Sequence, residues 1–408
     1  MSESYEILTA STVVDYVART PQLRAVLDPA AIRDVREVGD GNLNLVFVLS
    51  SPNGRGLVLK QALPYVRLVG PTWPMTPDRA RHEAVALSVH GRLAPGLVPA
   101  LYHYDADRYI VAMEDLSDHR VWRHALNEGD RHAGAAADMG EYVARVAFGT
   151  SVFGMDPGEQ KRLLAESVNP QLCGITEDLV FTEPYVPADR NSTLPANEQD
   201  ARELAADEAV VREMGWLKWQ FMTQAEALIH GDLHTGSVMV REASDGRTRS
   251  TKAFDSEFAF YGPIGFDLGA LFGNYVIAAA RAIALRQDEQ ARWALGLWGE
   301  TWSAFEACFR DLWPGRLDPR VFRDGTLEDY LARVRLDGAG FAAAKMARRI
   351  VGLAKTADIE TLPEHLREGA ARGVLRAARH IAVARHASSD PTILTVRVGE
   401  ILVATRTQ

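Results

Sequence analysis

The spacing of hydrophobic positions changes part-way along the chain. Up to residue 115, apolar residues form short runs bounded by glycine, proline and aspartate, which is typical of strands. Helices are predicted over residues 12–27 and from Thr76 to about residue 93, and strands over residues 43–49, 57–61, 101–104 and 109–113. The pattern over the first 115 residues therefore predicts a small lobe built on an antiparallel sheet.

From residue 116 onward the apolar residues recur mostly at helical spacing. The predicted helices cover residues 135–152, 198–228, 266–286, 290–313, 327–353 and 366–386. Residues 237–241 and 251–255 have the pattern of strands, and the alternation over residues 393–403 favours an edge strand or a tail. The two patterns together predict an α+β protein of two lobes, covering residues 1–115 and 116–408.

Composition excludes several classes of function. The 408 residues carry a net charge of −9, so the clustered basic excess of a general nucleic-acid binder is missing. Two cysteines, Cys173 and Cys308, cannot build a disulfide framework or close a cysteine-based zinc site. The first residues are acidic, unlike a signal peptide, and the apolar run 268–280 is too short to span a bilayer. We expect a cytoplasmic protein with no nucleic-acid or membrane partner.

The most informative motif is His230-Gly-Asp-Leu-His234, which we expect to follow the end of a helix. Asp232 lies in this loop, and Asp255 and Glu257 follow the next predicted strands. Phosphoryl transfer needs such a set: one carboxylate orients the attacking hydroxyl and can accept its proton, and later acids hold Mg²⁺. An isolated His-Gly-Asp can equally cap a turn, but the acids in this order favour the catalytic interpretation.

The small lobe supplies matching parts. Gly39, Gly41 and Asn44 lie at the start of a predicted strand, where glycines let backbone N–H groups approach phosphates. Lys60 lies on the next strand and Glu83 on the following helix, and such a pair can position a nucleotide. Each part alone has a simpler explanation, since many hairpins contain glycines and strand lysines often reach outward along an edge.

These motifs resemble the S-methyl-5-thioribose kinase family, in the aminoglycoside and choline phosphotransferase branch of the protein-kinase-like fold. The loop ends at Ser237 where the wider branch has Asn, and Ser256 stands where the family usually has Pro. Arg348 and Arg349 look like the family's twin arginine. The likeness covers most of the chain, through residues 39–44, 59–66, 73–76, 113–119, 148–153, 176–185 and 258–267.

The resemblance implies a two-lobed kinase that uses ATP and Mg²⁺ to phosphorylate the anomeric 1-hydroxyl of a 5-modified ribose, and a homodimer. It makes Asp232 the catalytic base, and Asp255 and Glu257 the metal ligands. Residues expected near the nucleotide are Gly39, Gly41, Asn44, Lys60 and Glu83, with Glu114 and Leu116 at the adenine hinge. Residues expected near the substrate are Asp232, Trp73, Arg348 and Arg349.

Three alternatives remain open at this level. An apolar pocket separates substrates that differ by one methylene by only about 1–3 kcal/mol, so 5-deoxyribose or another 5-capped ribose is a second candidate substrate. An antibiotic or amino-alcohol phosphotransferase would have the same fold. The non-enzyme alternative is an inactive nucleotide-binding scaffold, which retention of Lys60, Asp232, Asp255 and Glu257 disfavours.

Overall fold

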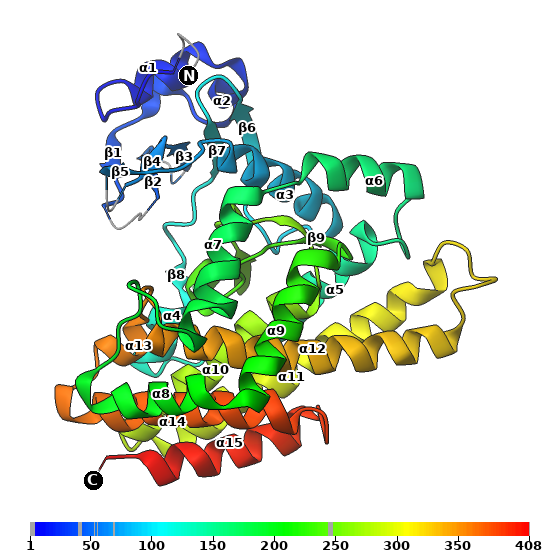
Figure 1. The fold of residues 1–408 in the computed structure, drawn as a ribbon. Coiled ribbons are helices and arrows are strands. Elements are labelled where there is room, and N and C mark those ends of the chain that lie inside the picture. Colours follow the sequence, from blue (N-terminus) through cyan, green and yellow to red (C-terminus); the bar gives the residue numbers. More distant parts are fainter. Residues whose placement is uncertain are drawn as a thin grey trace.

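A strand-rich lobe lies at one end of the molecule and a larger helical lobe at the other (Figure 1). The computed structural model describes residues 5–39, 43–52, 54, 56–67, 70–243 and 248–407. Within them, the predicted two-lobed α+β arrangement is confirmed.

The small lobe is built on a five-stranded antiparallel sheet in the order β1-β2-β3-β7-β6. The bounds are Asp34–Glu37 for β1, Asn44–Ser50 for β2, Gly56–Ala62 for β3, Ile110–Glu114 for β7 and Leu101–Asp105 for β6. Side chains alternate between the two faces of a strand. Phe47, Leu49, Leu57 and Leu59 pack against the N-terminal helices, which leaves Lys60 on the opposite face. The four predicted strands are confirmed.

The first predicted helix is wrong as one element. Two helices, α1 (Val13–Arg19) and α2 (Pro21–Val26), replace it because Pro21 has no N–H to continue the helix. The short hairpin of β4 (Tyr65–Val66) and β5 (Gly70–Pro74) follows the sheet. The long helix of this lobe, α3 (Arg79–Leu93), begins slightly later than predicted, and Asp78 is its N-cap.

The core of the helical lobe is α10 (Gly265–Ala284), which packs along α12 (Asp324–Val351). Around them lie α5 (Ala135–Thr150), α11 (Asp288–Leu312) and α14 (Glu364–Ala384). These five helices confirm the corresponding predictions. By length and composition α10 could cross a membrane, yet 94% of its most apolar window is buried inside the protein, as in the core helix of a globular fold.

The predicted helix over residues 198–228 is wrong in two places. Asp207 caps a new helix by accepting hydrogen bonds from the N–H groups of Ala209 and Val210, which divides the segment into α8 (Glu198–Ala206) and α9 (Glu208–Thr223). The last residues form the strand β9 (Ala227–Ile229), which pairs with β12 (Phe260–Gly262). Sequence patterns missed α4 (Trp122–Glu128), α6 (Pro157–Glu166), α7 (Pro170–Phe181) and α13 (Ala357–Glu360). The remaining strands are β8 (Arg120–Val121), β10 (Val238–Arg241) and β11 (Ser250–Ala253).

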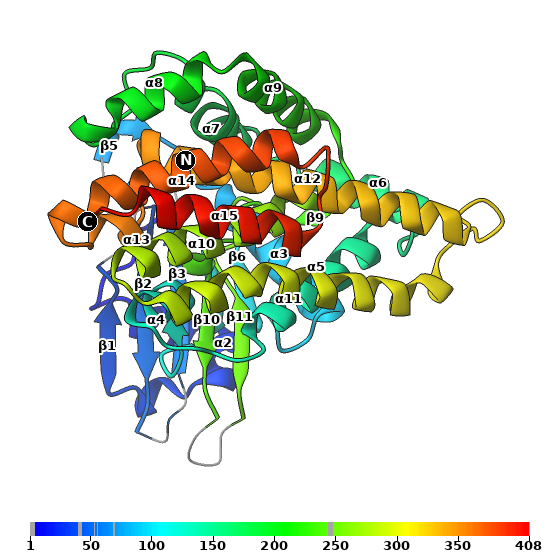
Figure 2. The same cartoon turned by 90° about the horizontal axis from the view of Figure 1, so that it is seen from below.

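The alternating segment near the C-terminus is also a correction. It forms the helix α15 (Pro391–Thr405), which lies beside α14 (Figure 2). Asp390 caps this helix and Pro391 occupies its first turn. Leu394, Val398 and Leu402 are buried at helical spacing, while other apolar residues on the outer face mimic a strand pattern in the sequence.

Close contact between α10 and α12 depends on Gly269. A Cβ at this position would lie 2.6 Å from the Phe341 Cβ and 2.7 Å from the Gly338 carbonyl oxygen. We expect Gly269→Ala to lower the free energy of unfolding by about 2 kcal/mol, since overpacking costs roughly 1–3 kcal/mol. Urea unfolding measures it. The control is Gly296→Ala on the exposed face of α11, where no atom lies within 4 Å and alanine should be neutral or stabilising. Equal stability of the two variants would contradict this account of the packing.

Candidate active site

The loop that carries Asp232 begins at the end of β9, not at the end of a helix as predicted. Asp267, in the first turn of α10, accepts hydrogen bonds from the backbone N–H groups of His230 (2.7 Å) and Gly231 (3.0 Å). Gly231 has φ +82°, and a Cβ there would lie 2.1 Å from the Phe258 carbonyl oxygen. The glycine is therefore required by both backbone angle and space.

The carboxylate of Asp232 lies against a basic helix. Its Oδ1 is 2.8 Å from the Nζ of Lys345 on α12, and its Oδ2 is 3.4 Å from the Nε2 of His234. Burial alone would raise the pKa of Asp232, but the positive charges of Lys345, Arg348 and Arg349 outweigh it and hold the pKa well below its usual range. Burial lowers the pKa of His234 far below its usual value, so its imidazole is neutral.

Both arginines of the predicted pair lower the pKa of Asp232. Arg349 is buried and Arg348 is mostly buried, near the C-terminal end of α12. Burial lowers the pKa of each guanidinium, and for Arg349 the charges of Arg348 and Arg123 lower it further. Within the described residues the guanidinium of Arg348 makes no hydrogen bond or ion pair. Buried guanidinium groups with so little compensation make this side of the site attractive to an anion.

The small lobe places Lys60 between two acids. Its Nζ lies 2.8 Å from Glu83 of α3 and also contacts Asp255, which follows β11. Burial by itself would lower the pKa of Lys60, but these carboxylates raise it, so the ammonium stays charged. Burial raises the pKa of Glu83 to about 7, and nearby acids add to that shift. The predicted Lys60–Glu83 pair is thus formed.

Glu257 is buried and held by residues of the small lobe. Its Oε2 accepts a hydrogen bond of 2.8 Å from the Nδ2 of Asn44 and lies 3.4 Å from the Nε of Arg79. The same Asn44 accepts a hydrogen bond from Arg79 through its Oδ1 (3.1 Å). The side chain of Asn44 thus links the strand β2 to Glu257, and its place near phosphates stays a prediction.

The acids can accept a divalent cation. One carboxylate oxygen from each of Glu83, Asp255 and Glu257 lies within 4.8 Å of the others. Three carboxylates face two cations, Lys60 and Arg79, which leaves an excess of negative charge in a buried space. Hard oxygen ligands of this kind suit Mg²⁺, so the donor set fits the metal predicted for Asp255 and Glu257.

Other predicted residues make no hydrogen bond or ion pair with this cluster among the residues described. Glu114 ends β7, and its carboxylate is 3.0 Å from the Nζ of Lys252, so a hinge contact there would use its backbone. Leu116 is buried just beyond. No side-chain clash requires glycine at Gly39, and Gly41 lies outside the described residues. Trp73 is half-buried on β5, and its place over a substrate stays a prediction.

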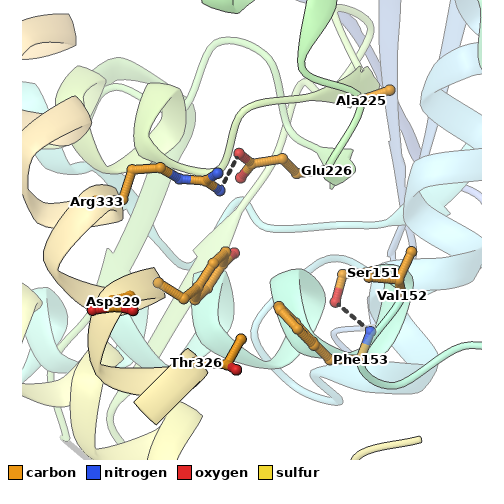
Figure 3. A pocket seen from close by; sticks show the side chains of 9 residues that line it. Ser151, Val152, Phe153, Ala225, Glu226, Thr326, Asp329 and Arg333 are labelled. Atoms are coloured by element: carbon orange, nitrogen blue, oxygen red, sulfur yellow. Dashed lines mark hydrogen bonds and ion pairs between the residues drawn. The ribbon is translucent and has the colours of Figure 1, made fainter. Parts of the chain in front are cut away.

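A cavity of about 480 Å³ lies between the end of α5 and the first half of α12 (Figure 3). Glu226 and Arg333 form an ion pair of 2.6 Å on its wall, and Tyr330 and Phe153 contribute aromatic rings. None of the predicted site residues lines this cavity. The chemistry is therefore concentrated at the charged cluster between the lobes.

Sequence reasoning missed three basic residues of the site. Arg79 comes one helical turn before Glu83, and Lys345 comes one turn before Arg348 and Arg349, so i, i+3 and i+4 spacing could have indicated both. Arg123 carries no such pattern. Its Nε lies 3.2 Å from Asp358, and its position near Arg349 depends on tertiary packing.

Comparison with known proteins agrees with this geometry. Residues 34–308 match the phosphotransferase enzyme family. A methylthioribose kinase of Yersinia pseudotuberculosis is 38% identical over 394 residues, covering 94% of each chain. A methylthioribose kinase of Pectobacterium carotovorum is 38% identical over 404 residues, covering 97% of this chain and 98% of that one. The chain belongs to the methylthioribose kinase family.

The methylthioribose kinases align with nearly the whole chain, whereas the match to the phosphotransferase enzyme family ends before α12 begins. The matched residues do not include the helix with Lys345 and the twin arginine. Among solved structures, a choline/ethanolamine kinase family protein from Mesorhizobium loti is 15% identical, with a TM-score of 0.43, covering 97% of this chain and 100% of that one. At that score the likeness says nothing about substrate.

His90 joins α3 to the strand that leads into the loop of Asp232. Its Nε2 lies 2.9 Å from the Leu228 carbonyl oxygen, its Nδ1 lies 2.9 Å from the Tyr142 hydroxyl, and burial lowers its pKa to about 3. The folded protein keeps His90 neutral while the unfolded chain binds a proton below its ordinary pKa of 6.5. The stability that neutral His90 contributes above pH 6.5 is therefore lost as the pH falls toward 3.

From pH 7.5 to 5.5, we expect the wild type to lose about 1.4 kcal/mol more free energy of unfolding than His90→Gln, since one extra proton is bound on unfolding. Urea unfolding at both pH values measures the difference. The exposed His365→Gln variant is the control for loss of a histidine. Parallel losses in the wild type and His90→Gln would show that His90 is not the group responsible.

Proposed function

We propose that this chain phosphorylates the anomeric 1-hydroxyl of S-methyl-5-thioribose with ATP and Mg²⁺. The observation that carries the proposal is that Asp232 contacts Lys345 of α12, while His230 of the same loop lies 2.8 Å from the carbonyl oxygen of Phe254, next to Asp255. Relatives at 38% identity over nearly the whole chain are named methylthioribose kinases, which supports the choice of sugar. The 1-phosphate would be a product of methionine salvage.

In this proposal Asp232 orients the acceptor hydroxyl and takes its proton as the bond to phosphorus forms. The transition state of phosphoryl transfer is largely dissociative, so positioning and charge supply most of the catalysis. The low pKa of Asp232 agrees with a role in orientation more than in strong proton abstraction. Arg348 and Arg349 would bind substrate hydroxyls or the transferred group, because a guanidinium offers a fixed charge and a planar set of donors.

The nucleotide would lie against the small lobe. Lys60, held by Glu83, would contact its phosphates, and the backbone around Glu114 and Leu116 would face adenine. Asp255 and Glu257, near Glu83, would hold Mg²⁺, which when bound neutralises phosphate charge. Gly39 and Gly41 would bring backbone N–H groups to the phosphates.

The proposal also covers the roles of the two lobes, the location of the protein and its oligomeric state. Residues 1–115 would form the nucleotide lobe, and residues 116–408 would carry the catalytic loop and the substrate site. A cytoplasmic location is supported by free cysteines, of which Cys173 has its pKa raised to about 12 by burial and is an inert thiol. The homodimer rests on the family resemblance, and light scattering of the purified protein tests it.

The deciding experiment is coupled ATP turnover with Mg²⁺ and four acceptors in parallel: methylthioribose, 5-deoxyribose, ribose and kanamycin. We expect kcat/KM for methylthioribose to exceed the others by at least about tenfold, which is what about 1.4 kcal/mol of extra binding provides. Asp232→Asn should lower kcat by about a hundredfold or more, because the amide cannot accept the proton. Asp130→Asn, on the helical lobe's surface, is the matched control.

Other outcomes would change specific parts of the proposal. Preference for 5-deoxyribose or kanamycin would keep the reaction type and overturn the sugar. Tight ATP binding without turnover of any acceptor would favour an inactive scaffold. Full activity of Asp232→Asn would remove Asp232 from the reaction.

A further inference from the structure

A lysine that the sequence motifs do not mark contacts the proposed catalytic acid. Lys345 lies in the middle of the buried stretch of α12, and its side chain is 4% exposed. Its Nζ donates a hydrogen bond of 2.8 Å to the Oδ1 of Asp232 and lies 4.3 Å from the centre of the Phe266 ring. The ammonium is thus enclosed by one carboxylate, one aromatic face and the helix that carries it.

A buried lysine is costly unless its charge is compensated. Burial lowers the pKa of Lys345 to about 8, and Arg348 and Arg349 act in the same direction, while Asp232 opposes them. An apolar residue would be cheaper for stability alone, because α12 is otherwise lined here by alanines that pack on α10. The lysine therefore points to a role at Asp232 beyond packing.

The two oxygens of Asp232 have unequal surroundings. Oδ1 is bound by Lys345 at 2.8 Å, whereas Oδ2 has, among the described residues, only the long 3.4 Å approach to the neutral His234. The Asp232 side chain keeps 21% of its surface exposed, so it is not fully enclosed by the protein. A carboxylate fixed at one oxygen presents the lone pairs of the other in a defined direction.

We propose that Lys345 is a positioning residue, which holds Asp232 by Oδ1 and leaves Oδ2 directed at the acceptor hydroxyl. This inference rests on the proposed function. As the acceptor oxygen bonds to the γ-phosphorus, the bond to the bridging oxygen breaks, its electron pair leaves with ADP, and the hydroxyl proton passes to Oδ2. Lys345 keeps Asp232 ionised and oriented until that moment and does not itself exchange a proton.

The titratable and charged groups around the pair come from three elements. His234 lies on the same loop as Asp232, Asp267 begins α10, and Arg348 and Arg349 lie on α12 with Lys345. Lys345 is the cation in hydrogen-bond contact with Asp232, and its charge lowers the pKa of Asp232 more than those of the others. Removing it should therefore raise that pKa, and an opposite charge at this range is worth about one to three pH units.

The test compares Lys345→Met, Lys345→Arg and the matched control Lys218→Met, whose lysine on α9 bonds Thr182 away from the site. With methylthioribose and MgATP, we expect Lys345→Met to lower kcat by about ten- to a hundredfold with KM for ATP changed less than about twofold. The acid limb of its kcat profile should move to higher pH by about one to three units. Lys345→Arg should restore most of the wild-type limb.

A second readout needs no substrate. Infrared difference titration of the protein labelled with ¹³C-aspartate, referenced to Asp232→Asn, follows protonation of the Asp232 carboxyl directly. A midpoint raised in Lys345→Met but not in Lys218→Met supports the inference even if wild-type turnover reveals another acceptor and the proposed sugar fails. An unchanged midpoint and acid limb, with only a lower unfolding temperature, would overturn it and make Lys345 a structural residue.

Discussion

Buried charge is the constraint on which the rest of this structure depends. Carboxylates and cations meet where the two lobes join, and most of them are buried, so each buried charge must be compensated locally. The result is two unlike halves: acids in excess around Lys60, and cations in excess around Asp232. A metal-bound nucleotide suits the first half and a phosphorylated sugar suits the second, which is how a fold shared by many phosphotransferases acquires a direction for transfer.

The secondary-structure elements determine where these charged residues lie, but not how their charges compensate one another. Lys60 comes from a sheet strand, Asp232 from a loop between short strands, and Lys345 from the longest helix described. Asp267 fixes the loop by taking two backbone N–H groups, so the direction of Asp232 follows from the start of α10. The cations of α12 then set its ionisation. The direction of Asp232 therefore depends on α10 and its ionisation depends on α12, and these two helices pack along one another.

Local patterns in the sequence predicted the parts of the site that lie in contiguous motifs. The His230–His234 loop, the acids at Asp255 and Glu257, and the Lys60–Glu83 pair were all found because their spacing has a meaning along the chain. Arg123 was not, since its partner comes from a distant segment. Arg79 was overlooked although it lies one helical turn before Glu83. The error at α15 has a different cause: apolar residues on both the inner and outer faces erased the helical period. Caps at Asp207 and Asp390 decided boundaries that hydrophobicity alone could not.

The distance along the chain between the partners has a consequence for how this protein folds. Asn44 and Glu257 are 213 positions apart, Lys60 and Asp255 are 195 apart, and Asp232 and Lys345 are 113 apart. Contacts of such high sequence separation form late, after the entropy of closing long loops has been offset by packing elsewhere. During synthesis the ribosome must release α12 before the loop around Asp232 can meet its cation. Completion of the charged cluster therefore coincides with completion of the fold, and an unfinished chain exposes the acid without its partner.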